Sequence, residues 1–240
     1  MPDKFQKELQ ETVAQVRGLL EDLQQLGVVE VPMEPESVVQ PVCSLDGRDS
    51  AIDCRVETLE EIRDDLGDCQ RCKLSKGREQ IVFGSGSTAA RLVLVGEAPG
   101  RKEDQQGVPF VGEAGALLER ILFAMGLKRE DVYICNIQKC RPPKNRDPLP
   151  EEVAACVPFL KRQLASLQPQ VIVTLGSLAS QTLLATPQPI KELRGHWQNY
   201  ADIAVMPTYH PAFLLRNPAA KREVWEDMKQ VMTRLRQGSC

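Results

Sequence analysis

The sequence has few aromatic residues, only two histidines and no long apolar run. Aromatic side chains make up 5% of its 240 residues. No apolar stretch approaches the roughly 20 residues that cross a bilayer, and the opening MPDKFQKELQ lacks the basic, then apolar pattern of a signal peptide. The phosphate-binding patterns GxxxxGK[ST] and GxGxxG are also absent. These absences argue against a membrane protein and a nucleotide-driven enzyme, and they predict a cytoplasmic location.

Eight cysteines stand out in a chain expected in a reducing compartment, where thiols stay free. Cys69 and Cys72 form a C-x2-C pair, and 15 residues separate Cys140 from Cys156. Four thiolates can hold zinc or an iron-sulfur cluster, and this spacing alone does not choose between them. Ordinary buried thiols are the alternative. The remaining cysteines lie in a linker, in a strand or at the chain end and are not predicted to be ligands: Cys43, Cys54, Cys135 and Cys240.

Charge is distributed unevenly along the chain. Residues 1–68 hold 17 acidic and 6 basic side chains, a net charge of −11, whereas the remainder carries +8. The C-terminal body is therefore basic enough to suit a polyanion such as DNA. A solvated basic face with no partner is an equally common explanation, so charge alone does not settle the function.

The N-terminal segment divides into a helix and a linker. Residues 1–27 place apolar side chains at alternating spacings of four and three, which predicts an amphipathic helix: Leu9, Val13, Val16, Leu20 and Leu23. This helix either packs on its own domain or docks on a partner or a second copy of the chain. Residues 28–56 are acidic, contain several prolines and read as a linker. The acidic extension could recruit repair partners, or it could mimic DNA and restrain the basic body.

From residue 57 to residue 240 the pattern alternates between strands and helices. Short apolar runs predict strands at 91–96, 131–137, 170–176 and 202–208. Helical spacing lies between them, at 114–127, 150–167 and 177–185, and Ser177 is the expected N-cap of the last. Fully apolar strands separated by helices predict an α/β domain with three α/β/α layers and a central, mainly parallel four-stranded sheet.

The loops after these strands carry the candidate functional residues. Ligands of such sheets bind at the carboxyl ends of the strands, and three of those ends bring Glu97, Asn136 and His210. The glycine-rich stretch VGEAPGRKEDQQGVPFVGEAG follows the first strand and allows close backbone approaches. Each residue has an ordinary explanation: Asn136 could cap a turn, His210 could be a core residue, and Glu97 could bind backbone N–H groups. Together they predict a site.

Three motifs, with CQRC upstream, carry a family resemblance in content and order: GEAPGRKEDQQGVPFVGEAG, NIQKCRPPKNRDPLPEEVAAC and HPAFLLR. They resemble the family 4 uracil-DNA glycosylases, the iron-sulfur branch of the uracil-DNA glycosylase superfamily, over about residues 57–236. The resemblance implies that family's fold and a monofunctional hydrolase that releases uracil from single- and double-stranded DNA and leaves an abasic site. The alternatives are a non-catalytic iron-sulfur module that binds DNA or senses redox state, and a scaffold.

The resemblance also implies the catalytic groups and the cofactor. His210 would donate a hydrogen bond toward uracil O2, Asn136 would pair with N3–H and O4, and Glu97 with nearby backbone would position water. A [4Fe-4S] cluster with a structural role would be held by four cysteines: Cys69, Cys72, Cys140 and Cys156.

The remaining implied contacts are to the base and to DNA. Gly96 and Ala98 would line the base, Phe110 would stack on it, and Glu103 would lie near C5 and crowd the methyl group of thymine. Leu214, Leu215 and Arg216 would enter the groove left by the flipped nucleotide. Phosphate contacts are expected from a basic cluster: Lys139, Arg141, Lys144 and Arg146.

Overall fold

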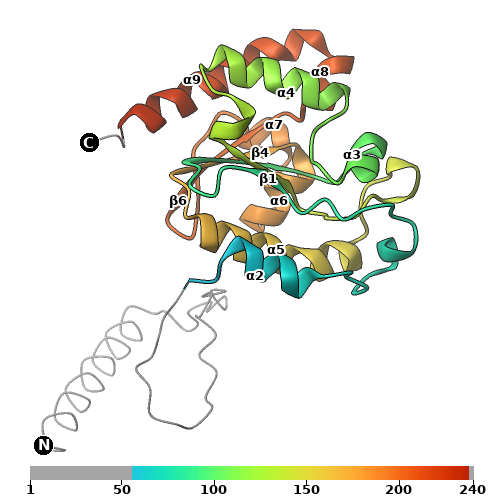
Figure 1. The fold of residues 1–240 in the computed structure, drawn as a ribbon. Helices are drawn as coiled ribbons and strands as arrows, with labels where there is room; N and C mark the ends of the chain where they lie inside the picture. Colours follow the sequence, from blue (N-terminus) through green and yellow to red (C-terminus); the bar gives the residue numbers. More distant parts are fainter. Residues whose placement is uncertain (1–55, 238–240) are drawn as a thin grey trace, which may run out of the picture. The chain divides into compact units, whose positions relative to one another are not determined.

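A computed structural model describes residues 56–237 and shows a six-stranded sheet between two layers of helices (Figure 1). The strand order is β1-β3-β2-β4-β6-β5. The four central strands are parallel, and β1 and β5 pair antiparallel with the outer two. The strands are β1 (Ser85–Gly86), β2 (Leu92–Gly96), β3 (Tyr133–Asn136), β4 (Val171–Leu175), β5 (Gln198–Tyr200) and β6 (Ile203–Thr208).

The two faces of the sheet bury separate apolar cores. Val93 and Val95 of β2 face a core shared with α5 (Pro150–Leu167) and α6 (Ser177–Leu184). Leu92 and Leu94, which alternate with them, face a core shared with α4 (Glu113–Ala124), α8 (Pro211–Arg216) and α9 (Lys221–Gln237). Helix α2 (Leu59–Leu66) packs on α5 (Figure 1). The predicted three-layer α/β/α class is confirmed.

Shorter helices complete the described part of the chain. They are α3 (Arg101–Gln106), α7 (Ile190–Leu193) and the 3-10 turns η1 (Lys73–Lys76), η2 (Arg129–Asp131), η3 (Pro143–Asn145) and η4 (Pro218–Ala220). Among the described residues no helix combines the length and the apolar character needed to cross a membrane.

The sequence prediction located all four central strands but differs at the edges. β1 and β5 were not expected, because Ser-Gly and Gln-Asn-Tyr have no apolar pattern and pair with the sheet only along one side. The prediction that Ser177 caps α6 is wrong. Gly176 holds the N-cap position at φ +98°, a conformation that favours glycine, and the helix begins at Ser177. The predicted helix at 1–27 and the linker, apart from Val56, lie outside the described residues and stay predictions.

Candidate active site and cysteine centre

Side chains predicted to be catalytic meet at the carboxyl edge of the parallel strands. Gly96 ends β2 in register with Asn136, which ends β3. A Cβ atom on Gly96 would clash with Asn136 Oδ1, and one on Gly176, after β4, would clash with Glu97 Oε1 and lie 3.1 Å from His210 Cβ. The structure therefore brings Glu97, Asn136 and His210 together around two glycines, and we call this group the strand-end site.

Phe110 forms one wall of the strand-end site. Its ring centroid lies 5.6 Å from that of His210, with 28° between the ring planes. Its Cζ would lie 2.6 Å from a Cβ atom on Gly96. Phe110 has φ +54°, a left-handed conformation that is unfavourable for a bulky residue. Its carbonyl accepts a hydrogen bond from Arg129 Nη1 at 2.9 Å, which helps to hold this conformation.

His210 is the N-cap residue of α8. Its Nδ1 accepts the backbone N–H of Ala212 at 3.1 Å, so in the neutral ring the proton lies on Nε2. Burial and the nearby charge of Arg216 lower the pKa of His210 to about 4 against a small opposing effect of Glu103. The imidazole is therefore neutral at physiological pH, with Nε2–H available as a donor.

Glu97 binds the start of α6. Its Oε1 accepts the backbone N–H of Leu178 at 3.2 Å, which is the ordinary explanation that the sequence left open for this residue. Burial raises the pKa of Glu97, the hydrogen bond from Leu178 opposes the rise, and the charge of Asp147 adds to it. Ala98, the next residue, is partly buried.

Glu103 organises the loop that carries Phe110. Its side chain is 8% exposed, and Oε1 accepts the backbone N–H groups of Val111 at 2.9 Å and Gly112 at 2.8 Å. Gly112 is the N-cap residue of α4 and offers no side chain of its own. Helices α4, α6 and α8 therefore all begin at the strand-end site, each beside an acceptor from Glu103, Glu97 or His210.

Two neighbouring amides in the strand-end region have unpaired polar atoms. Asn136 is 2% exposed, and its Oδ1 has no hydrogen-bond partner within the described chain. Gln138 is fully buried, and neither Oε1 nor Nε2 has a partner there. Its backbone N–H donates to the Glu97 carbonyl at 3.0 Å. Gln138 was not predicted as a site residue, although a buried-type position with a polar side chain directly after the apolar run of β3 was a usable signal.

Two of the predicted DNA contacts are buried in the core, which corrects the prediction. Lys139 is 1% exposed, and its Nζ donates to the Asn136 carbonyl and to Gln163. Leu214 is 1% exposed because the inner face of α8 packs against the core shared with α4. Leu215, 39% exposed, and Arg216 remain at the surface of the same helix.

The remaining predicted phosphate contacts lie in the loop before α5, and one of them is already paired. Arg146 donates through both terminal nitrogens to Glu152, at 2.8 and 2.7 Å, and Glu152 is 1% exposed. This bidentate pair braces the loop, so Arg146 is a poor phosphate ligand in this conformation. Arg141 Nε donates to Asn145 at 2.7 Å, whereas Lys144 is exposed.

The four cysteines predicted as ligands share one electrostatic neighbourhood, which we call the cysteine centre: Cys69, Cys72, Cys140 and Cys156. Burial raises the pKa of Cys140 to about 11, although Arg78 opposes the rise, and the charges of Cys156 and Cys72 add to it. Burial likewise raises the pKa of Cys156, to which Cys72 and Cys69 contribute. Among residues 56–237 no group of three or more His, Cys, Asp or Glu side chains is arranged closely enough to be recognised as a metal site.

Nitrogen donors point at three of these sulfurs. Arg71 Nη1 lies 3.5 Å from Cys69 Sγ, and Arg78 Nη1 lies 3.5 Å from Cys140 Sγ. The backbone N–H of Lys139 donates to Cys156 Sγ at 3.3 Å. A cavity of about 550 Å³ adjoins Cys72, and both arginines line it. The donors to Cys140 and Cys156 favour thiolates, which accept hydrogen bonds better than thiols do, and so oppose the rise in pKa that burial causes.

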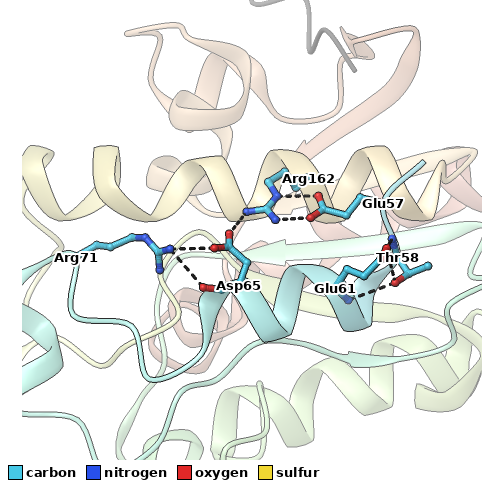
Figure 2. A network of polar contacts seen from close by, with 6 residues as sticks. All are labelled: Glu57, Thr58, Glu61, Asp65, Arg71 and Arg162. Carbon is cyan, nitrogen blue, oxygen red and sulfur yellow. Dashed lines mark hydrogen bonds and ion pairs between the residues drawn. The ribbon is translucent and has the colours of Figure 1, made fainter. Parts of the chain in front are cut away.

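A polar network fixes Arg71 from the surface of α2 and α5. Figure 2 shows Arg162 of α5 paired with both Glu57 and Asp65, and Asp65 in turn accepts Arg71 Nη2 at 3.1 Å. Thr58 begins α2 with a capping box, in which its backbone N–H donates to the Glu61 carboxylate at 2.8 Å. The start of the described chain is therefore linked through α2 to the residue that donates to Cys69.

The chain is similar to known proteins of one superfamily. The profile of the Uracil DNA glycosylase superfamily matches residues 83–229. The chain is 44% identical to the type-4 uracil-DNA glycosylase of Saccharolobus solfataricus, over 73% of this chain and 86% of that protein. It is 43% identical to the type-4 uracil-DNA glycosylase of Thermotoga maritima, over 73% of this chain and 94% of that protein. The type-5 uracil-DNA glycosylase of Pyrobaculum aerophilum is 35% identical, over 62% of this chain and 72% of that protein.

Proposed function

Since the chain belongs to the type-4 uracil-DNA glycosylases of the uracil DNA glycosylase superfamily, we propose how its strand-end site recognises and releases uracil. The enzyme is a hydrolase of base-excision repair that removes uracil from DNA. Its substrates under this proposal are single- and double-stranded DNA, and the product is an abasic site without strand cleavage.

His210 carries the proposed chemistry. Cleavage of the bond between uracil N1 and the sugar C1′ leaves a uracil anion, so a donor aimed at the developing charge accelerates the reaction. The Ala212 N–H occupies Nδ1 and directs the Nε2 proton outward as that donor, toward uracil O2. Loss of one such donor costs about 100- to 1000-fold in rate. This fixed tautomer is the observation on which the proposal mainly rests.

The helix at His210 adds to this effect. Helix N-termini carry a partial positive charge, but the carboxylates of Glu97 and Glu103 offset it at α6 and α4. His210 is neutral, so the positive end of α8 is not cancelled by its own cap. Stabilisation of the leaving anion therefore comes from α8 and His210 together.

Recognition of the base is assigned to the groups around Gly96. The target base leaves the duplex before it can react, and Phe110, which lies beside His210 and Gly96, would stack on it. The unpaired Asn136 Oδ1 would accept uracil N3–H while its amide nitrogen donates to O4, a pattern that cytosine inverts. Glu103, held by Val111 and Gly112, fixes the loop beside C5 and crowds the methyl group of thymine. Glu97 with nearby backbone positions the attacking water.

For the cysteine centre we propose a [4Fe-4S] cluster held by the four cysteines. Three of the four sulfurs already have nitrogen donors, which would support them as thiolate ligands. Such a cluster would link the segment before η1, the loop after β3 and helix α5. Its role under this proposal is structural.

Contacts with DNA are limited to side chains that are at least partly exposed and not paired with a carboxylate. Leu215 and Arg216 would enter the space left by the flipped nucleotide, and Lys144 with Arg141 would meet phosphates. Binding should therefore weaken steeply with salt.

The test is release of free uracil from a uracil-containing oligonucleotide by iron-replete protein, with a thymine-mismatch strand alongside. His210→Ala should slow release about 100- to 1000-fold. The matched control is His196→Ala, which changes the chain's only other histidine, an exposed residue, and should leave the rate unchanged. Equal rates in the two variants would remove His210 from the mechanism. Loss of uracil release by His210→Ala with DNA binding retained would exclude the alternative of a module that only binds.

A further inference from the structure

In the sequence Lys139 lies between Asn136 of the strand-end site and Cys140 of the cysteine centre, and its side chain is buried. It is 1% exposed and follows Asn136 by three residues, immediately before Cys140. The structure gives it no ion pair with a carboxylate of the described residues. A long amine in such surroundings is unfavourable unless its donors are satisfied, so its specific partners indicate what it does.

The Nζ atom of Lys139 joins β3 to α5. It donates to the Asn136 carbonyl at 2.8 Å and to Gln163 Oε1 at 2.6 Å. Gln163 is itself fixed, because its Nε2 donates to the Phe83 carbonyl at 3.0 Å and to the Tyr133 hydroxyl at 3.3 Å. The amine is therefore held at a defined place rather than simply enclosed.

The Asn136 carbonyl needs such a donor because β3 loses its outer neighbour at this point. β1 pairs with β3 only through Tyr133 and Ile134, so within residues 56–237 no strand continues along the outer edge as far as Asn136. On the inner side, Gly96 is in register with Asn136, and the following residue, Ile137, donates to the Gly96 carbonyl at 2.9 Å. Lys139 Nζ thus supplies the hydrogen bond that a neighbouring strand would otherwise give.

The main chain of Lys139 is tied to the cysteine centre. Its N–H donates to Cys156 Sγ at 3.3 Å, and its carbonyl accepts the Val82 N–H at 2.8 Å. Cys140 is the next residue. One residue therefore contacts a predicted ligand through its backbone and the uracil-reading strand end through its side chain.

We propose that Lys139 is a positioning residue for Asn136, which it holds by the backbone carbonyl, and that it connects the cysteine centre to base recognition. The inference rests on the proposed role of Asn136. It predicts that removing the amine slows uracil excision through Asn136 and not through a general loosening of the fold.

A double-mutant cycle in the iron-loaded full chain tests this proposal. Lys139→Met keeps an unbranched side chain that is shorter by the one amine atom and so removes the donor, and it is combined with Asn136→Ala. Single-turnover excision is measured at saturating enzyme and compared at equal iron content. Lys139→Met should slow excision about 10- to 100-fold in the native background but less than about 3-fold beside Asn136→Ala, with DNA affinity little changed. Iron content should stay near that of the native protein, because the N–H to Cys156 is retained.

Lys161→Met is the matched control. Lys161 lies two residues before Gln163 on α5, is partly buried, and makes no hydrogen bond or ion pair within the described residues. Its effect on the rate should be below about 3-fold in both backgrounds. If Lys139→Met does not fold, Gln163→Met loosens the amine from α5 and should show the same coupling to Asn136, with a smaller effect.

Two results would overturn the proposal. One is an equal slowing by Lys139→Met in both backgrounds, which would mean a structural effect only. The other is a native excision rate for Lys139→Met together with a slow rate for Asn136→Ala. That result would refute the role of Lys139 and leave the proposed function intact. A native rate for Asn136→Ala would instead refute the role of Asn136 itself, and the Lys139 proposal with it.

Discussion

Lowering the pH from 7 to 5 should leave His210 neutral and competent. Burial and the charge of Arg216 place its pKa at about 4. At pH 5 about 90% of such a histidine is neutral, against about 3% of one with the ordinary pKa of about 6.5. If the neutral ring is the donor toward uracil O2, protonation of His210 reduces excision by about 10% at pH 5, instead of about 30-fold.

Two measurements together check this expectation. NMR of protein labelled at histidine follows the titration of His210 separately from that of His196, since the chain has only these two. Single-turnover uracil release is then recorded over the same pH range. Burial also raises the pKa of Glu97, so Glu97→Gln is needed to remove any acid limb that belongs to that carboxylate. A titration midpoint of His210 near pH 6.5, together with a fall in the rate of uracil release over the same pH range, would refute the reasoning.

The same pKa shift affects stability. An unfolded histidine takes up a proton near pH 6.5 and the folded one only near pH 4, so between these values the unfolded chain binds more protons. The contribution of neutral His210 to stability is complete above pH 6.5 and is lost as the pH falls to about 4. The difference between these two pKa values corresponds to an upper limit of roughly 3 to 4 kcal/mol, less what solvent screening removes from a partly exposed ring. The stability of the native protein relative to His210→Ala, measured by denaturant unfolding, should therefore be lower at pH 4.5 than at pH 7.

Three further predictions concern residues around the two centres. Gly96→Ala would drive a methyl group against Asn136, so uracil release should fall at least about 10-fold while thermal unfolding shows an intact fold; a native rate would place the base elsewhere. Glu152→Gln leaves Arg146 without its carboxylate and should lower the unfolding free energy by about 1–3 kcal/mol in denaturant titrations, and no loss would mean that this pair does not brace the loop. Gln138→Leu removes two buried unpaired polar atoms and should raise the melting temperature, whereas a fall would show that the amide is satisfied in solution.

Much of the fold followed from local patterns in the sequence. The four central strands are short apolar runs because both faces of each are buried, and such runs are recognisable without any tertiary information. The family, the fold class and the activity were predicted correctly from motifs that lie at the ends of these strands. The edge strands were missed because β5, Gln-Asn-Tyr, has one partner and a partly exposed surface, and its pairing depends on where β6 lies.

The errors at the candidate site have a different cause. Lys139 stands in a basic cluster and looked like a surface residue, but its exposure is decided by a β-sheet edge that stops two residues before Asn136. Leu214 and Leu215 are adjacent in sequence and equivalent in composition, yet the turn of α8 buries one and exposes the other. Neither fact is encoded in a local pattern, because both depend on elements that are distant in the chain.

The use of His210, Glu97 and Glu103 as acceptors at helix starts also limits how the enzyme can be redesigned. A variant that binds uracil without excising it would be a useful probe for damaged DNA. The obvious choice, an alanine at position 210, removes a cap as well as a donor, and loss of an N-cap typically costs about 1 kcal/mol of stability. His210→Ser keeps an acceptor for the Ala212 N–H while removing the imidazole, so a stable probe should start from that substitution.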